Sequence, residues 1–241
     1  MLELKNISFE VPENGTEKGI IKDISMTVPD GKFTVLTGPN GGGKSTLAKL
    51  IAGIQEPTSG QILWDGQDIT KMGITERAQL GISYAFQQPV RFKGIRVLDL
   101  IRLAKGEDIS VSGACEYLSQ VGLCAKDYIN REVNASLSGG ELKRIEIATV
   151  LARGTHLSVF DEPEAGIDLW SFQNLIQVFE RIHEKIHGSI LIISHQERII
   201  NIADEIFVIT DGEVSGHGTK DEILPELLGS SNAVNICDGG R

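Results

Sequence analysis

The chain has 241 residues, enough for one domain with a good core or one domain with a small insertion. Its hydrophobic content of 41% is ordinary for a globular protein, and its net charge of −10 disfavours nucleic acid or an anionic membrane surface as main partners. The apolar runs are too short to span a bilayer, the N-terminus lacks a signal-peptide shape and the three cysteines lack metal-like spacing, so we expect a reduced, cytoplasmic protein without direct membrane insertion.

Short apolar runs in the first third of the chain predict strands. The segments expected to be strands are residues 2–9, 20–28, 33–37, 61–64 and 81–86. Proline, asparagine and glycine residues over 11–19 predict a turn between the first two. Residues 46–52 have a helix-forming composition and stop at Gly53, so a helix is expected directly after the third strand.

The rest of the chain changes character twice. Residues 97–153 have helical patterns and little strand signal, which predicts a helical insertion. Beyond it, strands are expected at 157–160, 189–193 and 205–210, and helices at 168–187, 196–201 and 221–228. Strands that alternate with helices imply an α/β fold with a parallel sheet.

A phosphate-binding loop lies between the third strand and the first helix. The pattern G-x-x-x-x-G-K-[ST] is matched by Gly38, Pro39, Asn40, Gly41, Gly42, Gly43, Lys44, Ser45 and Thr46. Its glycines allow backbone N–H groups to approach phosphate oxygens, while Lys44 supplies positive charge and the Ser45 hydroxyl is suited to Mg²⁺. The alternative is an ordinary glycine-rich turn, but the strand before and the helix after are the context that the pattern requires.

Two further motifs carry chemistry. Asp161 and Glu162 follow an apolar strand, where Asp161 could reach Mg²⁺ and Glu162 could orient or deprotonate an attacking water. Ser138, Gly139 and Gly140 precede a helix expected from Glu141 to Ala152, whose exposed N–H groups would make an anion site. A simple helix N-cap is the alternative for the serine.

With these motifs in this order, and with Gln87, Asp168 and His195 beside them, the chain resembles an ATP-binding-cassette (ABC) ATPase over residues 1 to about 228. The resemblance implies a P-loop NTPase fold, with a RecA-like parallel-sheet core, an antiparallel β subdomain and a helical subdomain. It implies ATP and Mg²⁺ as cofactors. It also implies that Gln87 contacts Mg²⁺ and the attacking water, that His195 contacts the γ-phosphate and that Asp168 communicates between subunits.

The same resemblance implies boundaries and an assembly. The catalytic lobe is expected over about 1–87 and 155–228, the helical subdomain over about 88–154 and a loose tail over 229–241. Two cassettes would pair head to tail, with each ATP between Lys44 of one chain and Ser138, Gly139 and Gly140 of the other. Phe9 is near the position where the family stacks an aromatic ring on adenine, although a core aromatic is as good a reading.

Within the family, residues 85–95 resemble the segment that follows the Q-loop in SufC-type ATPases of the SUF iron–sulfur assembly system. The run from Ser138 to Arg144 resembles the S-G-G-E-x-K-R run of that group, whereas Pro163 is typical of transporter cassettes. SufC-type function would imply a soluble SufB/SufD-type scaffold as partner, docked at about Gln88–Arg96.

Further expectations follow from this subfamily. Arg91, Lys93 and Arg96 would form a small basic spot on the docking segment, unless they are merely scattered surface charges. Lys143 is expected to lie near Glu162 and hold it off in the nucleotide-free state. The alternatives to this function are the ATPase subunit of an ABC importer and an ABC switch on DNA or ribosomes, and the chain lacks the basic tracts typical of the latter.

Overall fold

The structure is a computed structural model that describes residues 1–13, 15–185 and 188–233. Its first sheet is antiparallel and has four strands in the order β2-β1-β4-β5. These are β1 (Leu2–Glu13), β2 (Thr16–Val28), β4 (Ser59–Trp64) and β5 (Gln67–Asp68). The hairpin expected over 11–19 is confirmed, but its turn is tighter than expected, because the pairs Val11–Lys18 and Glu13–Thr16 continue the ladder through most of that segment.

The second sheet has six strands in the order β10-β9-β3-β8-β7-β6. These are β3 (Phe33–Thr37), β6 (Ile82–Ala85), β7 (Leu157–Asp161), β8 (Ser189–Ile193), β9 (Glu205–Thr210) and β10 (Glu213–Gly218). All neighbours are parallel except β9 and β10, which form an antiparallel hairpin. The carboxyl ends of β3, β6, β7 and β8 therefore meet at one edge, which is where open parallel sheets bind ligands.

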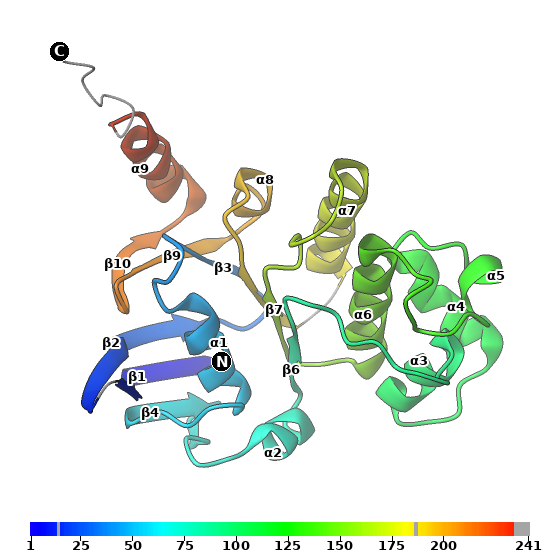
Figure 1. The fold of residues 1–241 in the computed structure, drawn as a ribbon, viewed down its shortest axis with the longest axis horizontal. Coiled ribbons are helices and arrows are strands. Elements are labelled where there is room, and N and C mark those ends of the chain that lie inside the picture. The colour runs from blue at the N-terminus through cyan, green and yellow to red at the C-terminus, as the bar shows by residue number, and fades with distance from the viewer. Residues whose placement is uncertain (14, 186–187, 234–241) are drawn as a thin grey trace.

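Figure 1 shows α1 between the two sheets and a group of helices beyond β6 and β7. The helices are α1 (Lys44–Ala52), α2 (Ile74–Gln79), α3 (Val97–Lys105), α4 (Val111–Gln120), α5 (Ala125–Tyr128), α6 (Gly139–Arg153), α7 (Leu169–Lys185), α8 (Glu197–Ile200) and α9 (Lys220–Ala233). The short α2 was not expected from the sequence. Helix α9 continues to Ala233, so residues 229–233 are helical where a loose tail was expected, and residues 234–241 lie outside the described part.

Two apolar clusters hold these layers together. One lies between the sheets and joins β1, β2, β3 and β9 to α1, with Leu47, Leu50 and Ile51 fully buried. The other covers the opposite face of the parallel sheet and runs without a break into α3, α4 and α6. Helix α6 contacts α3, α4, α7 and β6, so the expected helical insertion shares its core with the sheet.

A buried arginine closes the end of α1. Arg77 on α2 donates to the carbonyl oxygens of Leu50 at 2.6 Å, Ile51 at 2.9 Å, Thr70 at 3.0 Å and Met72 at 2.9 Å. Burial lowers the pKa of its guanidinium to about 10, against the raising effect of Asp68. The last carbonyls of α1 would otherwise lack hydrogen bonds inside the core, so Arg77 fixes the helix whose other end is the phosphate loop.

Candidate nucleotide-binding active site

The phosphate loop joins β3 to α1 and needs its glycines. Gly43 is the N-cap of α1 with φ of 102°, and a Cβ there would lie 2.7 Å from Ile21 Cδ1. At Gly38, with φ of 124°, a Cβ would lie 2.2 Å from the carbonyl oxygen of Ile209. Left-handed backbone and close approach both exclude a side chain at these positions.

A hairpin far along the chain supports this loop. Gly212, in the turn between β9 and β10, donates its N–H to the Gly42 carbonyl at 3.0 Å. Its own carbonyl accepts from the Lys22 N–H at 2.8 Å, which ties the loop to β2 as well. This contact between the hairpin and the phosphate loop was not expected from the sequence.

Lys44 is the buried cation of the loop. Its Nζ donates to the carbonyl oxygens of Gly38 at 2.9 Å and Pro39 at 2.8 Å. Burial lowers the pKa of Lys44, while the carboxylates of Glu162 and Asp161 raise it. Around it, Pro39, Asn40 and Gly41 are exposed, Gly42 is buried and Ser45 and Thr46 are half-buried. The ammonium is thus held at the turn of the chain that would surround a phosphate.

Asp161 lies at the carboxyl end of β7, and its carboxylate accepts hydrogen bonds from two hydroxyl groups. Ser45 Oγ donates to Asp161 Oδ1 at 2.9 Å, and the Tyr84 hydroxyl donates to Asp161 Oδ2 at 2.7 Å. Burial raises the pKa of the Tyr84 hydroxyl, and Asp161 raises it further. A hydroxyl beside a buried carboxylate is a donor set that Mg²⁺ favours, so Ser45 and Asp161 fit the expected cation. Tyr84 was missed, although it lies on β6 only three residues before Gln87.

Glu162 is contacted by both of the other expected catalytic residues. Gln87 Nε2 donates to Glu162 Oε2 at 2.6 Å, and His195 Nε2 lies 3.7 Å from Glu162 Oε1. Burial and the nearby Lys44 lower the pKa of His195, against the raising effect of Glu162. The backbone of Glu162 has φ of 43°, which is uncommon for a residue with a side chain. Loops from three neighbouring strands thus converge on one carboxylate.

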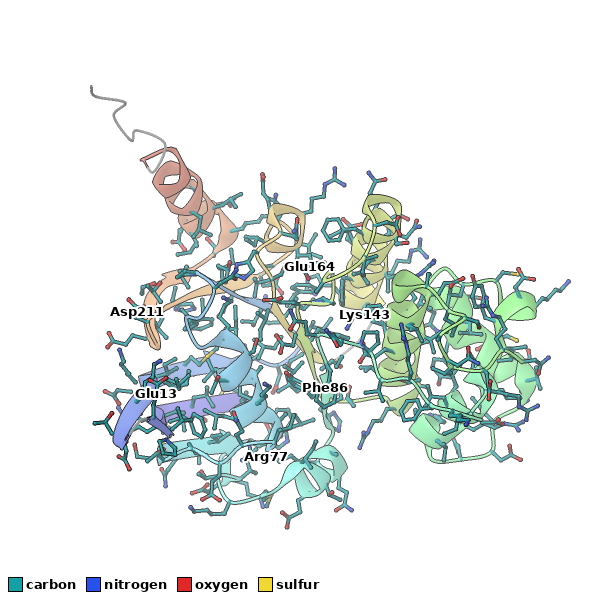
Figure 2. The ribbon with its side chains drawn as sticks, viewed as in Figure 1. Glu13, Arg77, Phe86, Lys143, Glu164 and Asp211 are labelled. Atoms are coloured by element: carbon teal, nitrogen blue, oxygen red, sulfur yellow. The ribbon has the colours of Figure 1, made fainter. Side chains whose placement is uncertain are left out.

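Lys143 does not contact Glu162, so the expectation that it holds this carboxylate is wrong. It is 1% exposed and lies on α6. Its Nζ donates to the Phe86 carbonyl at 2.5 Å and to Glu146 Oε2 at 2.9 Å. Glu146 is one helical turn away on α6 and better placed to neutralise the ammonium. Lys143 therefore joins α6 to Phe86, the residue directly before Gln87; Figure 2 labels both Phe86 and Lys143.

The signature residues start α6 and pack against the loop before α7. Ser138 is the N-cap, with its Oγ accepting from the Glu141 N–H at 3.2 Å. A Cβ on Gly140 would lie 2.8 Å from Ser171, and one on Gly139 would lie 3.2 Å from the Gly166 carbonyl oxygen. Asp168 Oδ1 in turn accepts from the Ser171 N–H at 3.0 Å.

The structure brings the signature and Asp168 together but leaves them apart from the phosphate loop. In the described part of the chain, no hydrogen bond joins Ser138, Gly139 or Gly140 to residues 38–46. Ser138 and Gly139 are exposed. Phe9 lies on β1 opposite Ile21 and packs against the core between the sheets, in agreement with the core-aromatic reading.

The chain matches the family model described as ABC transporter over residues 21–165, more than half of its length. It belongs to this family. It is 39% identical over 212 residues to an uncharacterized ABC transporter ATP-binding protein of Methanocaldococcus jannaschii, covering 85% of this chain and 84% of that protein. It is also 32% identical over 226 residues to the sulfate/thiosulfate import ATP-binding protein CysA of Synechocystis, covering 90% of this chain and 62% of that protein.

The solved structures agree on the fold. A dimeric ATP-binding cassette in a post-hydrolysis state, bound to ADP and Pi, superimposes with a TM-score of 0.81 at 22% identity, covering 91% of this chain and 99% of that one. The expected P-loop ABC cassette fold is confirmed. Because the chain is an ABC cassette, it is an ATPase whose cofactors are ATP and Mg²⁺.

Two expectations from composition can be compared with the described residues. Over 1–13, 15–185 and 188–233, no helix has the length and apolarity needed to cross a membrane. In the same ranges, His, Cys, Asp and Glu side chains do not gather in threes as metal ligands would. Cys115 and Cys124 are free thiols, and Cys237 lies outside the described residues.

Proposed function

We propose that this ABC ATPase is the ATP-hydrolysing subunit of a cytoplasmic iron–sulfur cluster assembly complex, acting on a SufB/SufD-type scaffold. The observation that carries the proposal is the segment 85–95, which resembles its counterpart in SufC-type ATPases and borders an exposed apolar groove. Because Gln87 lies in this segment and contacts Glu162, a partner bound here would act directly beside the catalytic carboxylate.

The groove lies between β6 and the helices α3 and α6. It has a volume of about 230 Å³. Its lining includes Phe86, Val90, Phe92, Leu100, Leu142 and Glu146. Phe86 is 40% exposed and Val90 is 48% exposed. Neighbouring apolar side chains that face water in this way are typical of a site that binds another protein. We infer that these two side chains anchor the scaffold.

The basic spot expected on this segment is smaller than predicted. Arg96 is paired with Asp99, with Nε at 2.9 Å from Oδ2 and Nη2 at 3.1 Å from Oδ1. Arg91 and Lys93 remain exposed. The backbone of the segment is itself fixed, since Phe92 N–H donates to the Val133 carbonyl at 2.8 Å. Recognition would therefore combine an apolar anchor with two cations.

Catalysis in this proposal uses a head-to-tail pair of cassettes. Lys44 and the loop glycines would bind the phosphates of one ATP, and the exposed Ser138 and Gly139 of a second copy would cover them. Ser45, Gln87 and Asp161 would hold Mg²⁺, which would neutralise phosphate charge. Glu162 would orient the attacking water and accept its proton, with His195 at the γ-phosphate. ATP binding would then control association, and association would move the scaffold.

The second candidate is the ATPase subunit of an ABC importer. The likeness to CysA, an import ATP-binding protein, favours it. Both candidates use the same groove, so the chemistry of the occupant separates them.

The test is co-expression of the full chain with a SufB/SufD-type scaffold from the same genome, followed by co-purification. We expect the scaffold to elute with wild type and with Val111→Asp, but not with Val90→Asp. Val111, on α4, is 49% exposed and does not line the groove, so it is a matched control for Val90. A chain that binds no scaffold but is recovered in detergent with a multi-span membrane protein would favour the importer.

A further inference from the structure

A carboxyl outside the expected motif residues joins the loops that carry Glu162 and His195. Glu164 is two residues after Glu162, and Ser194 directly precedes His195. Ser194 Oγ donates a hydrogen bond to Glu164 Oε1 at 2.5 Å. Ser194 is fully buried and Glu164, labelled in Figure 2, is half-buried. The bond therefore links the ends of β7 and β8 at the site itself.

The same serine fixes the backbone on both sides of His195. Its Oγ accepts from the Gln196 N–H at 3.0 Å while donating to Glu164. Its own N–H donates to the carbonyl oxygen of Leu36 on β3 at 3.1 Å. His195 is thus the middle residue of a segment held to β3, to Gln196 and to the loop after β7. The backbone that carries the imidazole cannot shift far without breaking the Glu164–Ser194 bond.

The Glu162 backbone needs such support. Its φ of 43° is in the left-handed region, which costs free energy for a residue with a side chain. The Glu162 N–H donates to the Ile193 carbonyl at 3.1 Å, and its own carbonyl accepts from the Ala165 N–H at 3.0 Å. Glu164 lies inside this short turn, so its anchor on Ser194 helps to hold the turn closed. A residue with a side chain keeps a left-handed backbone conformation only where contacts with its surroundings hold it there.

Glu164 places a carboxyl oxygen where its burial lowers the stability of the folded protein. Its Oε2 atom is buried and makes no hydrogen bond to any described residue. Burial raises the pKa of its carboxyl, against the lowering effect of the Ser194 hydrogen bond. A carboxyl that keeps one buried oxygen without a hydrogen-bond partner among the described residues calls for an explanation other than stability.

We propose that Glu164 is a positioning residue for ATP hydrolysis, which sets the 3.7 Å separation of Glu162 Oε1 and His195 Nε2 by binding Ser194. The inference rests on the proposed roles of Glu162 and His195 in the reaction. In this proposal Glu164 is given no contact with the phosphate or the water. Its effect is on where the two reacting side chains stand.

The test measures kcat and KM for ATP with the full chain. Glu164→Ala and Ser194→Ala are expected to lower kcat about 10- to 100-fold, because small displacements of catalytic groups cost that much. KM and Mg²⁺-ATP affinity are expected to stay within about twofold, since the phosphate loop is untouched. Glu164→Gln and Ser194→Thr keep the acceptor and the donor, so they are expected to retain at least about half of kcat.

Controls separate positioning from general damage. The double variant Glu164→Ala/Ser194→Ala is expected to be no slower than either single variant, because both remove the same bond. Glu116→Ala, an exposed residue of α4, is expected to behave as wild type. Thermal unfolding of each variant checks the fold, and Ser194→Ala is the milder change should Glu164→Ala unfold.

Three results would overturn the inference. They are wild-type kcat in Glu164→Ala and Ser194→Ala, a fall in kcat matched by lost ATP binding, and a double variant whose losses multiply. Glu162→Gln in the same assay distinguishes the causes of failure. If Glu162→Gln is inactive while Glu164→Ala is fully active, the positioning role alone is wrong. If Glu162→Gln is fully active, the assigned chemistry is wrong and this inference fails with it.

Discussion

Gln87 Nε2 donates a 2.6 Å hydrogen bond to Glu162 Oε2, which joins the loop after β6 to the loop after β7. The first of these loops continues into the proposed docking segment, and the second carries the proposed catalytic carboxylate. A partner that shifts residues 88–96 would therefore also move Gln87, which is hydrogen-bonded to Glu162. This contact therefore connects the proposed docking segment with the proposed catalytic carboxylate.

Glu162→Gln should separate ATP binding from ATP hydrolysis. The amide keeps the size of the side chain but cannot accept a proton from water, so we expect kcat to fall by about 100-fold or more. ATP binding should persist, and gel filtration with ATP should show a stable dimer. Glu116→Gln on the surface of α4 is the matched control. Unchanged turnover would remove Glu162 from the mechanism.

Tyr84→Phe should lower the stability of the folded protein by removing a hydrogen bond at the expected Mg²⁺ site. The substitution removes the 2.7 Å hydrogen bond to Asp161 Oδ2 and leaves a buried carboxylate oxygen without its donor. We expect a loss of about 1.5–3 kcal/mol in the free energy of unfolding, measured by urea titration without Mg²⁺. Tyr117→Phe is the control, because the Tyr117 hydroxyl makes no hydrogen bond to the described residues. Equal stability of the two variants would contradict the prediction.

Lys143→Met should destabilise the protein strongly, because it leaves Glu146 buried without its cation. The expected loss is about 3–5 kcal/mol in the free energy of unfolding. Burial raises the pKa of Glu146 and Lys143 opposes this, so the unpaired carboxyl should take up a proton more readily. Lys143→Met/Glu146→Leu should recover most of the loss, and Lys126→Met on the exposed face of α5 should cost little. A double variant as unstable as the single one would refute the pairing.

Protonation of His195 should lower stability as the pH falls. Burial and Lys44 hold the pKa of His195 below its ordinary value of 6.5, so the unfolded chain binds this proton first. Stability is then lost as the pH falls through 6.5 towards the lower pKa of the folded protein. Urea unfolding of wild type and His195→Gln between about pH 8 and about pH 5.5 should show the steeper decline in wild type. Identical slopes would contradict this sign.

Arg77→Met should loosen α1 from the end opposite the phosphate loop. Four carbonyl oxygens would lose their donor inside the core, so the expected loss is about 3 kcal/mol in the free energy of unfolding. Arg198→Met, at an exposed position of α8, is the matched control. ADP binding followed during unfolding would show whether the phosphate loop is lost together with the helix. A wild-type unfolding midpoint for Arg77→Met would contradict the proposed capping role.

The parts of the site that the sequence predicts are those that local patterns define. A strand, a glycine-rich turn and a helix start are each contained in a few residues, and parallel strands then bring Ser45, Asp161 and Glu162 to one edge. The pair Lys143–Glu146 was also visible at helical spacing, and that spacing should have outweighed the expected contact with Glu162.

The features that the sequence did not predict are contacts between distant segments. Gly212 on the phosphate loop, Tyr84 on Asp161 and Ser194 on Glu164 each join residues at least 30 positions apart, and no local pattern marks them. Helix α2 was missed because six residues carry too little periodicity to stand out. For Phe9 the sequence left two readings open, and the partly buried ring packs against the core between the sheets.

Helix α6 makes one contact at its start and another in its middle. Ser138 caps its exposed start, while Lys143 and Glu146 in its middle hold the peptide just before Gln87. In a head-to-tail pair, the start of this helix would touch the neighbour's nucleotide while its middle holds the Gln87 segment of its own subunit. ATP bound at one site would then shift the Gln87 segment at the other site. ATP hydrolysis at the two sites should therefore be coupled rather than independent.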